Sequence, residues 1–294
     1  MIFIIKLVFF LYCSNIERYN TIKFHTRDQK MKVKNICKSF EKDGFVLVKN
    51  LLKKTEIKRV FSQLNDLINV PTSTIDPSLT KKLTLDEKYV LLARKNPKLK
   101  SHFYDMIKYM DGLQQISTSK KILNIAKKIM KENVVAVGTS QVRIDHVSSP
   151  YWLPQHQELG QMSTKCTLFY IPLTNLNKKS GGLYVRPGTH KLGFQPYKGH
   201  DVEGKAYGPD RQKIVDKLFK KPHLKKYKNH YMKLNAGDAV IFHNYLFHGT
   251  LPNFDKKSVR WVYIIRFYSI NKTPYLKNSK NPLSIPYTAN YHLL

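Results

Sequence analysis

The residues best suited to chemistry in this chain are two groups of potential metal ligands. His156 and Glu158 lie two residues apart in the segment PQHQELG. In an extended segment such residues point to the same side, so both can face one interior. His243 and His248 follow much later and are five residues apart. If one strand carries both, they point to opposite faces, and only one of them can join His156 and Glu158.

Two histidines and one carboxylate on one face would leave three adjacent coordination positions of a metal open. That arrangement suits iron(II) in an oxygenase, with two positions for a bidentate co-substrate and one for O₂. Downstream, Arg260 could pair bidentately with a carboxylate in the interior, and Arg266, on the same face by its even spacing, is its rival. Spacing alone leaves a zinc hydrolase open, because such enzymes also use two histidines and a glutamate, although the helical motif HExxH is absent.

The elements that must position these residues differ between the two halves of the chain. Apolar residues at helical spacing predict helices in the first half, and short β-branched runs bounded by Pro and Gly predict strands in the second. Thr55 is the expected N-cap of the second helix. We expect helices at 33–43, 56–68, 86–95, 100–115 and 119–131, a loop at 70–84, and strands at 45–48, 134–137, 142–147, 167–171, 182–185, 239–242 and 259–268. The sequence therefore predicts a mainly β fold of the jelly-roll kind with flanking helices.

Composition narrows the class of protein. The formal charge is +31, but lysine heavily outnumbers arginine and is spread along the whole chain, which favours a solvated basic surface over a nucleic-acid footprint. The three cysteines form no metal or disulfide spacing, which favours a reducing, cytoplasmic location. The apolar segment 2–13 is interrupted by Lys6 and is too short to span a membrane.

The expected organisation is one domain with appendages. Met31 begins a segment that reads as a natural domain start, so we expect residues 1–30 to be an extension outside the fold. The domain would cover 31–270, with a helical part at 31–132 and a jelly-roll core at 133–270. Residues 193–232 are polar and lysine-rich, which favours a lid or insertion, and residues 271–294 are expected to form a surface tail.

The sequence resembles the phytanoyl-CoA dioxygenase family of iron(II)/2-oxoglutarate oxygenases. The resemblance covers most of the chain after Met31, and each of its pieces alone is weak whereas the combination is specific. The matching segments are DGFVLVKNLL (43–52), HQELGQM (156–162), GGLYVRPGTHK (181–191), GDAVIFHNYLFHGTLPN (237–253) and RWVYIIRF (260–267). The resemblance implies a double-stranded β-helix, which agrees with the jelly-roll prediction.

The resemblance also implies roles for individual residues. It makes His156, Glu158 and the distal His248 the iron ligands. Arg260, twelve residues after His248, would bind the far carboxylate of 2-oxoglutarate. Thr250 would assist that contact, and Tyr170 would pack beside the co-substrate. Family members mostly carry aspartate at the position of Glu158, so this glutamate is a departure; a carboxylate at this position favours hydroxylation over halogenation.

Further residues are candidates from their place in the chain. Gln141 and Arg143 lie on a strand leading to the metal site and could contact the co-substrate or the substrate. Trp152 could line the pocket. His190 either organises a turn or contacts substrate at the pocket rim.

The predicted function is hydroxylation of a small organic substrate with Fe(2+), 2-oxoglutarate and O₂, releasing succinate and CO₂. An anionic substrate would suit the lysine-rich segment, and no nucleic-acid or membrane partner is expected. Two alternatives stay open: a non-catalytic jelly-roll binding module, and a nucleic-acid-acting oxygenase of the same chemistry. A steep salt dependence of nucleic-acid binding would identify the latter.

Overall fold

The computed structural model describes residues 29–138, 140–147, 149, 156–158, 165–195, 213, 216–256 and 258–271. The expected extension at 1–30 and the tail at 271–294 therefore lie almost entirely outside the described residues. The same holds for the middle of the expected lid at 193–232. These boundaries stay predictions.

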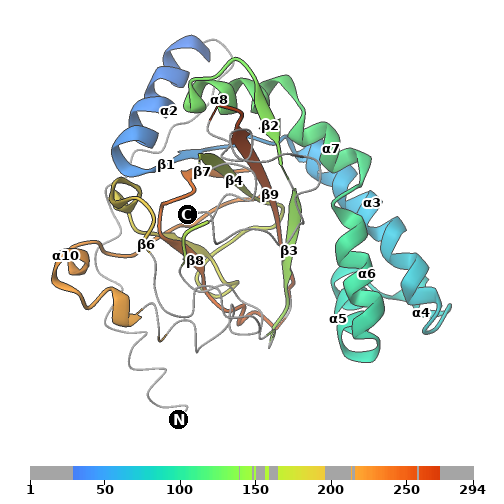
Figure 1. Ribbon diagram of the computed structural model, residues 1–294. Coiled ribbons are helices and arrows are strands. Elements are labelled where there is room, and N and C mark those ends of the chain that lie inside the picture. Colours follow the sequence, from blue (N-terminus) through green and yellow to red (C-terminus); the bar gives the residue numbers. More distant parts are fainter. Residues whose placement is uncertain are drawn as a thin grey trace, which may run out of the picture.

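A six-stranded antiparallel sheet forms the larger layer of the molecule (Figure 1). Its strand order is β1-β7-β4-β9-β2, and β3 also pairs with β9. The strands are β1 (Phe45–Val48), β2 (Val135–Val137), β3 (Gln141–Asp145), β4 (Cys166–Pro172), β7 (Ala239–His243) and β9 (Arg260–Ser269). All six were expected from the sequence, although their bounds shift by one or two residues.

A smaller, three-stranded sheet has the order β6-β5-β8. It consists of β5 (Leu183–Val185), β6 (His230–Tyr231) and β8 (His248–Thr250). The sequence predicts only β5, because β6 and β8 are two and three residues long and carry too little pattern to recognise. The two antiparallel sheets and their helices form the expected jelly roll.

The two faces of the larger sheet bury different sets of residues. Leu168 and Tyr170 of β4 pack with Val262 and Ile264 of β9 in a cluster that also includes Leu183 of the smaller sheet. This cluster is the interior between the sheets. The alternate residues of the same strands, such as Phe169 and Trp261, pack with the helices instead. Both faces are therefore apolar, and β4 is buried along its whole length.

Helices cover the outer face of the larger sheet (Figure 1). They are α2 (Gln29–Asp43), α3 (Lys54–Ser73), α4 (Leu79–Lys82), α5 (Leu85–Lys95), α6 (Pro97–Ile107), α7 (Asp111–Ser117) and α8 (Lys120–Met130); the 3-10 helix η1 (Thr189–Leu192) and α10 (Pro222–Lys225) lie in the second half. Among the helices of the described residues, none is both long and apolar enough to cross a bilayer.

Three expected helices, at 33–43, 56–68 and 100–115, were wrong in detail, and the first of them begins at Gln29. Helix α3 begins at Lys54 rather than after Thr55, because the Glu56 carboxylate accepts the Lys53 backbone N–H at 2.7 Å. It also runs on into the expected loop at 70–84, which contains α4 as well.

The expected helix at 100–115 is divided into α6 and α7. The Gln63 side chain of α3 donates to Asp111 at 2.6 Å and accepts the Gly112 N–H at 3.2 Å, so it caps the start of a new helix. A side chain at Gly112 would collide with the Gln63 amide, so this cap requires the glycine.

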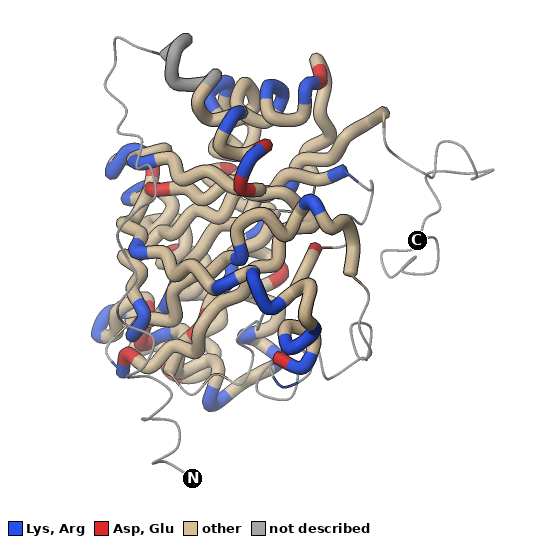
Figure 2. The backbone as a smooth tube through the Cα atoms, turned by 90° about the vertical axis from the view of Figure 1, so that its left-hand side faces the viewer, with Lys and Arg blue, Asp and Glu red and all other residues tan. Residues whose placement is uncertain are grey.

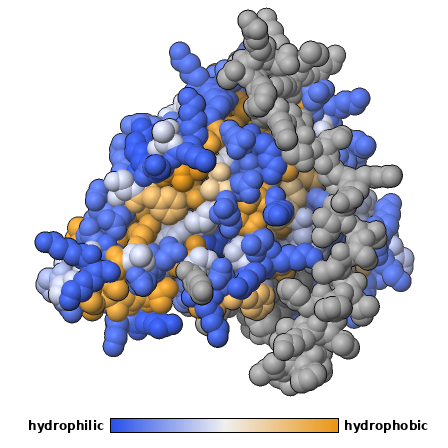
Figure 3. All heavy atoms as spheres, turned by 180° about the vertical axis from the view of Figure 1, so that it is seen from behind, coloured by the Kyte–Doolittle hydropathy of each residue, from blue (hydrophilic) through white to orange (hydrophobic). Residues whose placement is uncertain are grey.

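The surface is basic in many places. Figure 2 shows Lys and Arg residues distributed over many elements rather than gathered on one of them. On the opposite face from Figure 1, hydrophilic side chains surround smaller exposed hydrophobic areas (Figure 3). This distribution agrees with the lysine pattern of the sequence.

Candidate metal centre

His156 and His248 are joined through their backbones. The His156 N–H donates to the His248 carbonyl at 2.8 Å, and the His248 N–H donates to the His156 carbonyl at 3.0 Å. His248 begins β8 of the smaller sheet, while His156 forms an isolated bridge beside it. Directly opposed residues of an antiparallel pair present their side chains to the same face, so the two imidazoles lie side by side, with ring centroids 4.3 Å apart.

Glu158 completes the cluster from the same short segment as His156. One potential ligand atom from each of His156, Glu158 and His248 lies within 4.8 Å of the others. The Nε2 atom of His156 is 3.7 Å from Oε1 of Glu158. Both histidines are buried, with 6% and 5% of their surfaces exposed. Three donors thus converge in the protected interior of the jelly roll.

The environment of His248 prepares it as a neutral ligand. Its Nδ1 lies 2.9 Å from the Leu246 carbonyl, so the proton belongs on Nδ1 and the Nε2 lone pair is left for a metal. Burial, reinforced by His156, lowers the pKa of His248 to about 3. The imidazole is therefore unprotonated at neutral pH, as metal ligation requires.

Glu158 stays ionised despite its burial. Burial alone would raise its pKa, but Arg266, followed by His156 and His248, lowers it well below the ordinary value. The Arg266 Nη2 donates to Glu158 Oε1 at 3.0 Å. The Glu158 backbone N–H donates to the Asn244 carbonyl at 2.8 Å, which fixes the backbone from which the side chain extends. The carboxylate is thus held in its charged, ligating form.

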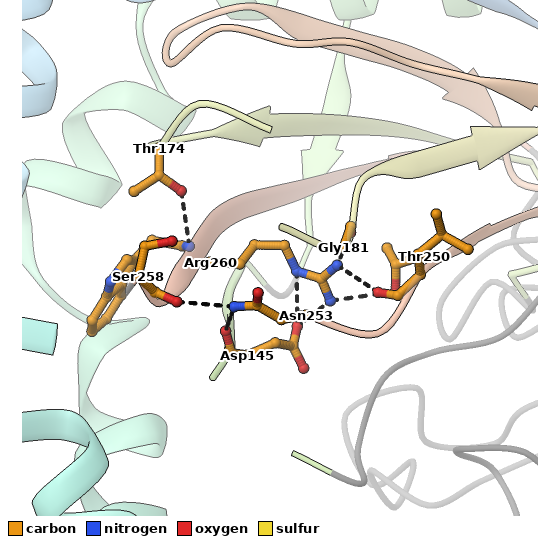
Figure 4. Close-up of polar contacts among 9 residues, drawn as sticks. Asp145, Thr174, Gly181, Thr250, Asn253, Ser258 and Arg260 are labelled. Carbon is orange, nitrogen blue, oxygen red and sulfur yellow. Dashed lines mark hydrogen bonds and ion pairs between the residues drawn. The ribbon is translucent and has the colours of Figure 1, made fainter. Parts of the chain in front are cut away.

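Arg260 lies in the same interior and is bound on most of its edges (Figure 4). Its Nε donates to Asp145 at 3.1 Å, and Nη2 donates to the same carboxylate. Nη1 donates to the Leu251 carbonyl at 3.0 Å and to the Gly181 carbonyl. Gly181 has a φ of +80°, and a side chain there would collide with the guanidinium. Asp145 therefore neutralises Arg260 in this structure.

One edge of Arg260 is less fully used. Its Nη2 lies 3.4 Å from the Thr250 hydroxyl, at the long limit of a hydrogen bond (Figure 4). The sequence pairs Arg260 with Thr250, and the structure brings these two together. The sequence does not predict Asp145 as the partner of Arg260, because nothing in the local pattern distinguishes this aspartate from an exposed one.

Tyr170 faces the interior near the arginine. Its hydroxyl is buried and has no hydrogen-bond partner among the described residues. Burial raises its pKa to about 12, with smaller effects from Arg260, Asp145 and Arg143. An unpartnered buried hydroxyl costs free energy, so this atom is suited to a group that arrives from outside the chain.

The remaining candidates lie in different places. On β3, Arg143 shares the face of Asp145. Burial would raise the pKa of Asp145, but Arg260 and then Arg143 lower it below its ordinary value. The Gln141 amide donates to the Tyr104 hydroxyl of α6. His190 lies 3.1 Å from the Glu41 carbonyl, so it contacts α2 instead of the metal ligands. Trp152 lies outside the described residues.

His243 points away from the cluster, as alternation along the strand requires. Its ring packs against Phe40 of α2 and against His190. Its Nδ1 accepts the Tyr245 N–H at 3.0 Å. Of the two histidines in this region, the structure therefore brings His248 to the metal cluster.

Two positioning residues were missed by the sequence analysis. Gln157, between the two ligands, is 2% exposed, and its amide donates to the carbonyls of Gly193 and Tyr245 at 2.8 and 2.7 Å. Asn244 is fully buried, and its Oδ1 accepts the Cys166 N–H at 3.3 Å. The only signal in the sequence was that both lie next to potential ligands.

Comparison with known proteins agrees with this geometry. A family model described as phytanoyl-CoA dioxygenase (PhyH) matches residues 40–260 of this chain. The chain belongs to this family. Its members are Fe(II)/2-oxoglutarate oxygenases.

Individual members of the phytanoyl-CoA dioxygenase family are distant in sequence. The peroxisomal phytanoyl-CoA dioxygenase of Bos taurus is 23% identical over 238 residues, which cover 78% of this chain and 66% of the bovine protein. The ectoine dioxygenase of Nocardia farcinica (strain IFM 10152) is 22% identical over 232 residues, covering 73% and 71%. The chain thus spans just under two thirds of the bovine relative.

A solved structure supports the fold alone. The non-haem α-ketoglutarate-dependent epimerase SnoN from nogalamycin biosynthesis aligns with a TM-score of 0.55 at 13% identity, covering 81% of this chain and 84% of that one. Such a likeness places the described sheets in the jelly-roll architecture of the family.

The donor set fits the iron of the phytanoyl-CoA dioxygenase family. Two imidazoles and one ionised carboxylate converge without a fourth protein ligand among the described residues. That composition leaves coordination positions for a co-substrate and O₂, whereas a structural zinc site would close with four ligands.

Proposed function

We propose that this protein is an Fe(II)- and 2-oxoglutarate-dependent dioxygenase that hydroxylates a small organic substrate and releases succinate and CO₂. The observation that carries the proposal is the convergence of His156, Glu158 and His248 within 4.8 Å in the interior of a jelly roll. Membership of the phytanoyl-CoA dioxygenase family supports the same chemistry.

The charges of the interior support a dianionic co-substrate. Arg260 is paired with Asp145, and Arg266 with Glu158, so these four described groups sum to zero. A divalent iron ion adds two positive charges, and 2-oxoglutarate supplies two negative ones. Uncompensated charge is costly in a buried site. The two negative charges of 2-oxoglutarate would offset the two positive charges of iron, which a neutral co-substrate would not do.

The far carboxylate of 2-oxoglutarate would lie between Arg260, Thr250 and Tyr170. Arg260 would donate from its Nη2 edge, where Thr250 is only 3.4 Å away and weakly bound. The Tyr170 hydroxyl would gain the hydrogen-bond partner that it lacks among the described residues. Because Asp145 already balances the charge of Arg260, the arginine would act mainly as a hydrogen-bond donor. Gln141, bound to Tyr104, would contribute only after leaving that partner.

The substrate would be small and anionic. Arg143 is half-buried on the interior face of β3, the face of Asp145, where its guanidinium would bind an anionic group of the substrate. The lysine-rich segment 193–232 would reinforce this preference. Trp152 stays a candidate for the pocket wall, whereas His190 packs against α2 and His243, away from the metal ligands. The basic residues are spread over many elements (Figure 2), which supports a small anion over a nucleic acid.

The chain would contribute orientation and exclusion of water. When bound, the iron would activate O₂ with electrons from 2-oxoglutarate, so the oxidising power belongs to the cofactor. The Leu246 carbonyl fixes the His248 tautomer, and Arg266 keeps Glu158 ionised. Burial of both histidines separates the reacting groups from solvent.

The experiment is an anaerobic titration with iron(II) and then 2-oxoglutarate. The signal measured is the visible charge-transfer band of the chelate. We expect a band in the wild-type chain and none in His248→Ala. His243→Asn is the matched control, because His243 lies on the opposite face, and it should keep the band. Arg260→Ala should need far more 2-oxoglutarate for the same signal.

A folded, iron-loaded wild-type chain without a band would exclude 2-oxoglutarate as co-substrate. The non-catalytic or zinc-type function would then take its place. A band without succinate release, in the presence of O₂ and candidate substrates, would restrict the proposal to binding.

A further inference from the structure

The carboxylate of Glu158 is shared between the metal cluster and an arginine. Arg266 Nη2 donates to Oε1 of Glu158 at 3.0 Å, and the two side chains are only 15% and 17% exposed. Arg266 belongs to β9 and faces the same interior as Arg260, six residues earlier on the strand. Burial alone would lower the pKa of Arg266, but Glu158 raises it, so the pair is a charged one.

The length of Glu158 makes this pairing possible. Aspartate, which the family mostly carries here, is one methylene shorter and would withdraw the carboxylate by about 1.5 Å. A gap of that size turns a 3.0 Å contact into one beyond hydrogen-bond distance. The length of the Glu158 side chain is therefore what brings its carboxylate within hydrogen-bond distance of Arg266.

We propose that Arg266 is the positioning residue of the metal centre: its guanidinium holds the Glu158 carboxylate through Oε1, the oxygen that also lies 3.7 Å from Nε2 of His156, so that this longer side chain presents its carboxylate to the metal in one orientation. The inference rests on the proposed function, because it concerns the iron site of that function.

One pair of contacts and two general principles support this role over a purely structural one. The backbone of Glu158 is tied to Asn244, so the free part of the residue is its side chain, which Arg266 holds. A guanidinium donates in a fixed plane and cannot itself ligate a metal, so it orients the carboxylate without competing as a ligand. Partners of this kind around ligating carboxylates commonly change metal affinity when they are removed.

The test is the binding of Mn(II), which reports affinity without turnover, by calorimetry or by its electron paramagnetic resonance. Arg266→Met removes the charge and the donors while keeping an unbranched stem, and we expect it to weaken Mn(II) binding by about 10- to 100-fold. Arg266→Lys keeps the charge and should recover much of that loss. Lys49→Met, which breaks a similar pair with Asp238 at 2.8 Å between the end of β1 and the start of β7, is the control and should bind normally.

A double-mutant cycle with Glu158→Asp separates positioning from general stability. Each single change should weaken Mn(II) binding, and the two losses should not add, because the shortened carboxylate no longer uses the arginine. Circular dichroism must show that each variant is folded. If Arg266→Met does not fold, the Mn(II) affinities of Arg266→Lys and Glu158→Asp are compared with that of the wild-type chain instead.

Two results would overturn the inference in different ways. Wild-type affinity in Arg266→Met, or fully additive losses in the cycle, would remove the role of Arg266 and leave the proposed function intact. A wild-type chain that binds neither Mn(II) nor Fe(II) would overturn the proposed function, and this inference with it.

Discussion

The backbone groups of His156 and His248 bind each other in both directions, at 2.8 and 3.0 Å. This reciprocal pair holds two metal ligands from distant parts of the chain in one fixed register. A slip of one residue would turn one imidazole out of the interior, because neighbouring residues of an extended segment face opposite sides. Sheet pairing therefore positions two of the three candidate metal ligands.

Gln157 should matter for the metal although it does not touch the cluster. Its amide holds the ligand segment to the carbonyls of Gly193 and Tyr245 and accepts the Gln195 N–H at 2.7 Å. We expect Gln157→Leu, which keeps the volume and loses these bonds, to lower the free energy of unfolding by about 1–3 kcal/mol. Mn(II) affinity should fall as well, measured by calorimetry. Unchanged affinity in a destabilised variant would show that the segment keeps its place without Gln157.

Tyr170→Phe should separate ligand binding from stability. The Tyr170 hydroxyl has no partner among the described residues, so its removal should leave the thermal midpoint equal or slightly higher. The affinity for 2-oxoglutarate should fall by about five- to tenfold, which is roughly 1–1.4 kcal/mol.

Tyr263→Phe is the matched control, on the helix-facing side of β9. Its hydroxyl donates to the Leu113 carbonyl at 2.9 Å, so this variant should lose stability and keep its affinity for 2-oxoglutarate. Equal 2-oxoglutarate affinity in Tyr170→Phe and the wild-type chain would exclude the tyrosine from the co-substrate site.

Asp145→Asn should strengthen the binding of 2-oxoglutarate. Asp145 neutralises the buried Arg260, and an amide of the same shape would leave the guanidinium charge available to an incoming carboxylate. We expect the dissociation constant to fall by about five- to tenfold, roughly 1–1.4 kcal/mol, in the anaerobic titration. The unliganded variant should be less stable, because a buried charge has lost its partner. Weaker binding would instead show that Asp145 orients Arg260 for the co-substrate.

His243 should make the protein less stable in mild acid. Burial, followed by His190 and Lys165, lowers its pKa from 6.5 to about 4 in the folded chain. The unfolded chain therefore binds a proton that the folded chain does not, and stability is lost as the pH falls from about 6.5 towards 4. At pH 5 this linkage amounts to roughly 2 kcal/mol.

Urea unfolding of His243→Asn at pH 7.5 and pH 5 measures this contribution. Asparagine offers an oxygen near the position of Nδ1 for the Tyr245 N–H, and it does not titrate. The variant should lose less stability between the two pH values than the wild-type chain does. His190, whose pKa is also lowered by burial, should account for part of what remains. Equal losses in both proteins would assign the acid sensitivity elsewhere.

The sequence by itself determined the class of the fold and the chemical types at its centre. Strands such as β4 and β9 carry enough β-branched and aromatic residues to be recognised locally, and alternation along an extended segment assigns each residue to a face. Alternation also showed that only one of His243 and His248 could join the other ligands, and the family resemblance selected His248.

Only the tertiary structure decided which charges meet. Arg260 pairs with Asp145, 115 residues away, and Arg266 pairs with Glu158, 108 residues away. In the same way, Gln63 caps the start of α7, 49 residues further on, by accepting the Gly112 N–H. Local patterns give the face of a side chain and its charge. The identity of its partner depends on which strands become neighbours and in what register, and that follows from packing of the whole chain.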